Sequence, residues 1–302
     1  MPTIQDLQKE VIKPGIYFNM PDQVYHADKS ISNSGMGKLQ HTPKWGLTVP
    51  TPRNYWYESN FNPNKELLDT TALKMGRALH YMVLEPEKFH QEFKIKPKVK
   101  TTTVAGMIGE GQYEELKNAA DALRNSGLIY SLFLNVMPEV AIFWVDEETG
   151  VPCRAKIDAL GLNIAADLKG TTNAYDVGYS IVDFGYHRQA GYYLEGISQI
   201  KELIKNGTAV IEDCPDQDWL EKFCETTHDK FPFIFQEKKA PYITRAIQLC
   251  PAAELNGLER ARAAMQIFKQ NYEQYGEEMW GTGLVDGVEM ITIDELPKKI
   301  EH

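Results

Sequence analysis

The feature that most constrains the fold is a pair of short apolar segments in the middle of the chain, each carrying one aspartate. The first holds Asp158 and the second Asp167, and a turn containing Gly161 and Asn163 separates them. Glycine and asparagine in a short connection favour a β-hairpin. Because side chains alternate along a strand, the hairpin would place both carboxylates side by side, with Lys169 on the face of Asp167. Such a group is costly to desolvate, and a divalent metal and a phosphate would offset that cost.

The segments around this hairpin predict a sheet. Residues 139–145 (EVAIFWV) are strongly β-prone, and the turn DEETG leads from them into the strand 151–160. With residues 164–169 they make a three-stranded meander, in which Glu139 projects beside the strand that holds Asp158. Further strands are expected at 208–211, 231–235 and 243–249.

Apolar stripes at helical spacing predict the helices that cover this sheet. They are expected at residues 67–84, 112–126, 186–205 and 251–275, and Ser32 or Ser34 is placed to cap a short helix that ends near Leu39. The prediction is an α/β fold, a central mixed sheet flanked by helices, in one domain. Its parts are an N-terminal lead-in and loop (1–66), a core (67–250) and a C-terminal helix and tail (251–302).

Composition limits the classes of protein that remain. The net charge of −10 speaks against a nucleic-acid partner, although it does not describe the local field of one channel. The chain has no apolar run long enough to span a membrane, and its first residues are charged and lack the apolar region of a secretory signal. Its four cysteines form no CxxC pair, so we expect reduced thiols and a cytoplasmic protein.

The spacing of Asp158, Asp167 and Lys169 resembles the signature of the PD-(D/E)xK nuclease superfamily, and its surroundings strengthen the likeness. Residues 76–80 (GRALH) and 84–86 (LEP) resemble the histidine motif of RecB-like and RecE-like enzymes. Further similar features are Glu139 as an additional acid, the Gln189-x-x-x-Tyr193 helix, and the segments 20–45 and 280–297 of RecE-like (exonuclease VIII) phage and prophage proteins. One departure is Ile157, which stands where the superfamily has proline.

The resemblance implies a metal-dependent site for phosphodiester hydrolysis. Asp158, Asp167, the Leu168 carbonyl and His80 would ligate Mg²⁺ or Mn²⁺, and the nitrogen ligand suits Mn²⁺ better. Lys169 would orient or polarise the attacking water. The remaining implied roles are a second metal or bridging water for Glu139, and positioning of the scissile strand for Gln189 and Tyr193.

The resemblance also implies a substrate and partners. The chain would digest linear duplex DNA ends 5′ to 3′ for phage-type recombination in a bacterial host, as a trimeric or tetrameric ring that works with a single-strand annealing protein. Candidate DNA-binding residues are Ser32, Ser34, Lys38, Arg77, Lys94, Lys96, Lys98 and Lys100. The alternative functions are an endonuclease or nickase on the same core, and a non-catalytic DNA-binding assembly protein.

The same residues could also have purely structural roles. His80 lies on the apolar side of its helix, where a satisfied core histidine is the commoner case. The lysines at 94–100 also suit a solvated edge strand that they protect from pairing. Glu139 could simply begin a strand, Gln189 and Tyr193 could form one wet helix face, and the two aspartates with Lys169 could form a structural ion pair.

Overall fold

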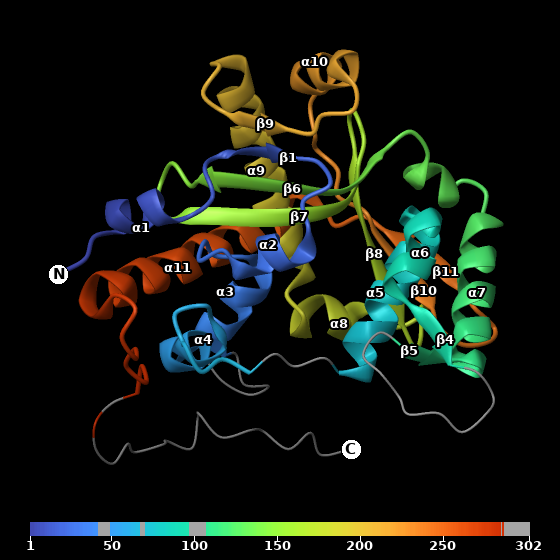
Figure 1. The fold of residues 1–302 in the computed structure, drawn as a ribbon, viewed down its shortest axis with the longest axis horizontal. Coiled ribbons are helices and arrows are strands. Elements are labelled where there is room, and N and C mark those ends of the chain that lie inside the picture. Colours follow the sequence, from blue (N-terminus) through green and yellow to red (C-terminus); the bar gives the residue numbers. More distant parts are fainter. Residues whose placement is uncertain (42–48, 67–69, 97–106, 285, 287–302) are drawn as a thin grey trace.

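The computed structural model describes residues 1–41, 49–66, 70–96, 107–284 and 286. Their centre is a seven-stranded sheet with the strand order β11-β10-β8-β7-β6-β1-β9 (Figure 1). The strands are β1 (Gly15–Tyr17), β6 (Met137–Val145), β7 (Pro152–Leu160), β8 (Ala165–Thr171), β9 (Val210–Glu212), β10 (Phe233–Glu237) and β11 (Thr244–Ile247). The pairs β1–β9 and β8–β10 are parallel and the others antiparallel, so the predicted mixed sheet and its β6-β7-β8 meander are confirmed.

Helices surround this sheet. They are α1 (Ile4–Glu10), α2 (Asp22–Ala27), α3 (Asn33–Leu39), α4 (Pro52–Glu58), α5 (Thr71–Leu84), α6 (Pro86–Glu92), α7 (Glu110–Arg124), α8 (Gly178–Asp183), α9 (Tyr186–Lys205), α10 (Gln217–Glu225) and α11 (Pro251–Tyr275), with a 3₁₀ turn η1 (Tyr130–Phe133). Two small sheets pair β2 (Gln40–His41) with β3 (Val49–Pro50), and β4 (Lys94–Lys96) with β5 (Met107–Gly109). None of the described helices is long and apolar enough to cross a membrane.

Two large hydrophobic cores hold the layers together. The larger core joins α1, α3, α4, α9 and α11 to the sheet, and Trp144 and Tyr192 lie at its centre. The second core packs α5, α6 and α7 on β8 and β10 through Leu79, Leu168 and Ile234. Each core buries a stripe of apolar residues from several helices, so burial of apolar area binds both groups of helices to one sheet.

Glycines let α9 and α11 pack backbone against backbone. A Cβ atom built on Gly257 would lie 1.9 Å from the carbonyl oxygen of His187, and one built on Gly191 would lie 2.3 Å from that of Glu254. Only a residue without a side chain fits at either position. This contact fixes α9, the helix that carries Gln189, against the rest of the molecule.

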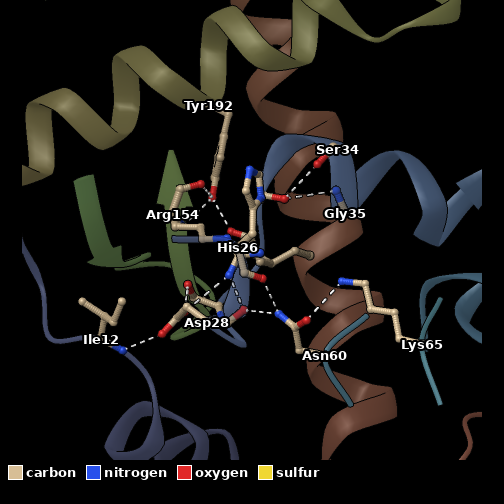
Figure 2. Close-up of polar contacts among 12 residues, drawn as sticks. Ile12, His26, Asp28, Ser34, Gly35, Asn60, Lys65, Arg154 and Tyr192 are labelled. Atoms are coloured by element: carbon tan, nitrogen blue, oxygen red, sulfur yellow. Dashed lines mark hydrogen bonds and ion pairs between the residues drawn. The ribbon is translucent and has the colours of Figure 1, made fainter. Parts of the chain in front are cut away.

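The N-terminal segment is more structured than the predicted extended lead-in. It contains α1, α2, α3 and strand β1, which lies between β6 and β9 inside the main sheet. Asp28 holds this segment together by accepting from the Ile12 amide at 2.7 Å, and Arg154 of β7 ties it to the sheet by donating to the Asp28 carbonyl (Figure 2). The Tyr192 hydroxyl lies 2.9 Å from the carbonyl oxygen of Ile31.

The loop predicted within residues 1–66 also needs correction, because the helix α4 lies in it. Pro52 stands in the first turn of that helix, where proline needs no amide partner. Tyr55 of α4 stacks on Trp280 with ring centroids 5.2 Å apart. The partner of α4 is therefore a residue more than two hundred positions away, which local patterning does not reveal. The short helices α6 and α8 were not predicted because one or two turns carry little periodicity. The nine-residue helix α10 was also missed, although Trp219, Leu220 and Phe223 give it an apolar side.

Candidate metal-dependent nuclease site

The candidate site lies where the sheet forks. β8 pairs with β7 only through Ala165 and Ala166, and from Asp167 onward it pairs with β10 instead. The fork leaves the Leu168 amide without a partner on β7, and the Asp158 carboxylate accepts from it at 2.7 Å. Continuing the register of the last paired residues places Asp158 opposite Asp167, as the hairpin predicted. The side chain of Asp158 thus replaces a missing ladder bond and stands at the opening.

Three side chains from three elements converge at this opening. His80 of α5, Glu139 of β6 and Asp158 of β7 each offer a ligand atom, and these atoms lie within 4.8 Å of one another. The His80 Nδ1 atom is 3.6 Å from Asp158 Oδ2 and 3.7 Å from Glu139 Oε1. The His80 Nε2 atom lies 2.8 Å from the Leu168 carbonyl oxygen. That hydrogen bond places the proton on Nε2 and turns Nδ1 toward the carboxylates.

Glu139 reaches the group through an unusual backbone conformation. Its φ angle is 52°, in the left-handed region that a residue with a side chain rarely adopts. The neighbouring pairs Pro138–Ala159 and Val140–Ile157 keep their register, so the distortion is confined to the residue opposite Asp158. Strain of this kind persists where surrounding contacts impose it, and it often accompanies function.

Asp167 lies next to this group but has other partners. Its carboxylate is 2.6 Å from the Lys169 ammonium and also accepts from the Gln189 side chain of α9. Lys169 itself lies over the Tyr186 ring, 4.8 Å from its centroid. The predicted Asp158, Asp167, Lys169, His80 and Gln189 therefore lie in one site, and Glu139 rather than Asp167 completes the tightest trio.

Sequence reasoning missed a second lysine. The Lys156 ammonium lies 3.3 Å from Glu139 Oε2 and also pairs with Asp22 of α2. It precedes Asp158 by two positions on the same strand, which is the signal that could have found it. Lys156 holds one oxygen of Glu139 and leaves Oε1 facing His80.

Charge shifts the pKa values across the site. Burial lowers the pKa of His80, but Asp158, Glu139 and Asp167 outweigh burial and raise it to about 9. Burial and then the charge of Asp167 raise the pKa of Asp158 to about 7. For Glu139, burial is outweighed by His80 and Lys156, so its pKa is lowered. The carboxylates thus favour a cation at the position of the His80 proton.

This donor set fits a divalent metal ion. It offers one imidazole nitrogen and carboxylate oxygens from two strands, at an opening whose field attracts positive charge. An imidazole together with carboxylates also suits Mn²⁺, which accepts nitrogen more readily than Mg²⁺ does.

Other predicted residues have different surroundings. Tyr193 is buried, with its ring centroid 5.4 Å from that of Phe231. Ser32 caps α3 by accepting from the Gly35 amide at 3.3 Å, and its hydroxyl oxygen lies 3.1 Å from the hydroxyl oxygen of Ser34. Lys38 pairs with Glu58.

The remaining basic candidates lie on two elements. Arg77 is exposed on α5, one turn before His80, and Lys94 and Lys96 lie on β4. Lys98 and Lys100 fall outside the residues that the structure describes.

Comparison with solved structures supports the fold. The structure resembles a crystal structure titled "Putative exonuclease" from Eubacterium rectale, with a TM-score of 0.54 and 13% sequence identity. The match covers 82% of this chain and 84% of that chain. A comparison with curated proteins found no match.

The sequence itself matches a family model. Residues 57–211, about half of the chain, match a family described as a PDDEXK-like domain of unknown function, DUF3799. The matched range contains His80, Glu139, Asp158, Asp167, Lys169 and Gln189. The chain therefore belongs to this family of PDDEXK-like domains, within the PD-(D/E)xK nuclease superfamily.

Proposed function

We propose that this protein is a metal-dependent exodeoxyribonuclease that digests linear duplex DNA from its ends. One observation carries the proposal: the sheet fork brings His80, Glu139 and Asp158 within ligand distance of one another, beside the Asp167–Lys169 pair. A structural ion pair needs no histidine and no third acid turned toward it by a left-handed backbone. The arrangement supplies what phosphodiester hydrolysis requires, namely charge relief at the phosphate and an oriented water.

The chain's own residues divide the work. His80, Glu139 and Asp158 would hold Mg²⁺ or Mn²⁺, with Asp167 and the Leu168 carbonyl beside them, and the ion supplies Lewis-acid relief of phosphate charge and a more acidic water. The Leu168 carbonyl fixes the His80 ring, and Lys156 fixes Glu139.

Lys169 is the group placed to contact the substrate. Asp167 and the Tyr186 ring hold its ammonium, and Gln189 in turn holds Asp167. From this position Lys169 orients the attacking water and stabilises the negative charge that develops on the phosphorus oxygens. Tyr193 is a positioning residue, because its buried ring on α9 packs against Phe231.

The finer assignment rests on the resemblance to RecE-like exonuclease VIII proteins. We propose 5′ to 3′ digestion that leaves a 3′ single strand for recombination, by a single nuclease domain assembled as a trimeric or tetrameric ring. A ring reconciles DNA binding with the net charge of −10, because its inner wall can be basic while its outside is acidic. A single-strand annealing protein, encoded by the same phage or prophage, would be the partner in the bacterial cytoplasm.

One assay on the full chain tests these points. Linear duplex and covalently closed circular DNA of the same sequence are incubated with Mg²⁺ or Mn²⁺, and the linear DNA carries a label at either its 5′ or its 3′ ends. We expect the linear DNA to be degraded with early release of the 5′ label, while circles stay intact. Cutting of circles would assign an endonuclease or nickase. Absence of cleavage with both metals would assign a non-catalytic DNA-binding protein.

A further inference from the structure

A strip of exposed apolar side chains borders the candidate site. It consists of Tyr175, Tyr179, Val182 and Phe184, with exposed fractions of 74%, 79%, 67% and 63%. We call these four residues the aromatic strip. Soluble proteins rarely gather large apolar side chains on an open surface without a binding role.

Helix α8 is anchored in a way that presents this strip outward. Val177 is buried in the larger core and Ile181, one turn later, packs against it. Tyr179 and Val182 are spaced three positions apart on the opposite side of the same turns. Packing of α8 therefore needs Val177 and Ile181 but does not need apolar side chains at Tyr179 and Val182.

The strip is continuous with the catalytic lysine. The ring centroids of Phe184 and Tyr186 are 5.8 Å apart, and Tyr186 stacks on Phe233 at 5.3 Å. The Lys169 ammonium lies over the Tyr186 ring, 4.8 Å from its centroid. An aromatic surface thus leads from solvent to the group that we place on the scissile phosphate.

Arg188 adds a cation that lacks an acidic partner. Its guanidinium donates to the Asn33 side chain at 2.9 Å and to the Asn33 carbonyl at 3.2 Å, and no ion pair involves it among the described residues. Burial, and then the like charge of Arg260, lower the pKa of Arg188 to about 10. Arg188 also precedes Gln189, which contacts Asp167. A half-buried guanidinium without a carboxylate favours an external anion.

We propose that the aromatic strip and Arg188 bind an unpaired stretch of DNA strand beside the scissile phosphate. Bases stack on Phe184 and Tyr179, whose rings accept any base, and Arg188 pairs with a backbone phosphate. The exposed Asp176 and Asp183 lie between strip residues in the sequence, and their negative charge disfavours a phosphate on the strip itself. This inference rests on the proposed function and defines its substrate as a DNA end with unpaired nucleotides.

Equilibrium binding to the full chain tests the proposal. Fluorescence anisotropy is measured in EDTA, which prevents cleavage, with a labelled single strand, a duplex carrying a single-stranded tail, and a blunt duplex. The variants are Phe184→Leu, which keeps apolar area without an aromatic face, Phe184→Trp, which enlarges that face, and Arg188→Gln. Controls are Leu128→Ala, an exposed apolar residue outside the strip, and Lys222→Gln of α10. Thermal melting verifies that each variant is folded.

The expected results separate stacking from simple hydrophobic contact. Phe184→Leu should bind the single strand and the tailed duplex about tenfold more weakly, while Phe184→Trp and both controls bind like the unchanged chain. Arg188→Gln should lower the slope of log affinity against log salt by about 0.7, the value for one phosphate of a single strand.

Two results would overturn the inference. One is unchanged affinity of Phe184→Leu and Arg188→Gln for the tailed duplex. The other is a change in oligomeric state of Phe184→Leu by analytical ultracentrifugation, which would assign the strip to contacts between copies of the chain. Failure of the proposed function looks different, because the unchanged chain would then cut circular DNA or cleave no DNA, whatever the strip binds.

Discussion

Asp158→Asn gives the sharpest test of the metal site, since asparagine keeps an oxygen that can accept from the Leu168 amide while the ligand charge is lost. The fork in the sheet should therefore persist, and the variant should melt close to the unchanged chain without metal. With metal, the melting temperatures of the variant and the unchanged chain should differ. A ligand at 100 times its Kd stabilises a protein by about 2.7 kcal/mol.

The size of the chain converts this energy into a temperature. An unfolding entropy of about 2.1 cal/mol/K per residue gives 302 residues about 0.63 kcal/mol/K, so 1 kcal/mol corresponds to about 1.6 °C. Saturating Mn²⁺ should then raise the melting temperature of the unchanged chain by about 4 °C. Loss of an outer-shell partner alone weakens metal binding 10–100-fold, so loss of a charged ligand should weaken it by about 100-fold or more. The shift for Asp158→Asn then falls below about 1 °C.

Differential scanning fluorimetry with Mn²⁺, Mg²⁺ or EDTA measures both melting temperatures. Glu221→Gln, which neutralises a carboxylate on α10 away from the fork, is the control and should keep the full shift. Reversal by EDTA separates binding from metal-induced aggregation. An undiminished shift in Asp158→Asn would refute the assignment of this carboxylate as a ligand. Absence of any shift in the unchanged chain would refute the site itself.

Three further predictions concern the lysine, the helix contact and a remote histidine. Lys169→Met keeps the stem of the side chain but removes the charge beside Asp167, and the cleavage rate should fall about 10²–10³-fold with DNA affinity little changed, as single-turnover assays can show. Gly257→Ala places a methyl group against the backbone of α9 and should lower the free energy of unfolding by about 3 kcal/mol in urea titrations, whereas Gly111→Ala, with no atom within 4 Å, should not lower it. Burial, with the charge of a lysine 2.7 Å away, lowers the pKa of His228 from 6.5 to about 4. Its stabilising contribution is therefore present above pH 6.5 and lost as the pH falls toward 4, on the order of 2–3 kcal/mol. The difference in stability between the unchanged chain and His228→Gln should shrink over that range, and a constant difference would contradict this.

Local patterns were enough where the stabilising contacts are local. The meander from β6 to β8 follows from β-prone runs joined by short turns, and the long helices follow from apolar stripes. The hairpin also predicted that Asp158 and Asp167 would lie side by side, and the register of the paired residues before the fork agrees with this. These features depend on residues a few positions apart.

The details of the site depend on contacts between distant elements. At the fork, β8 separates from β7 after Ala166, while its other edge pairs from Asp167 onward with β10, a strand more than sixty residues later in the chain. Because β7 no longer pairs with β8 at this point, the Leu168 amide can donate to Asp158 and the Leu168 carbonyl can accept from His80. Neither the left-handed conformation of Glu139 nor its contact with Lys156 follows from the local sequence.

The sequence by itself thus determined which functional groups are present: carboxylates, a lysine and a histidine at the spacing of a phosphodiester-cleaving nuclease. Only the tertiary structure decided which of these side chains contact one another. His80, Glu139 and Asp158 form one group, whereas Asp167 contacts Lys169 and Gln189. The physical reason is that hydrogen-bond partners and local charges determine a side chain's orientation, and these partners come from elements far apart in the chain. The alternation of side chains along a strand can place a carboxylate at the fork in the sheet, but it does not determine which cation that carboxylate binds.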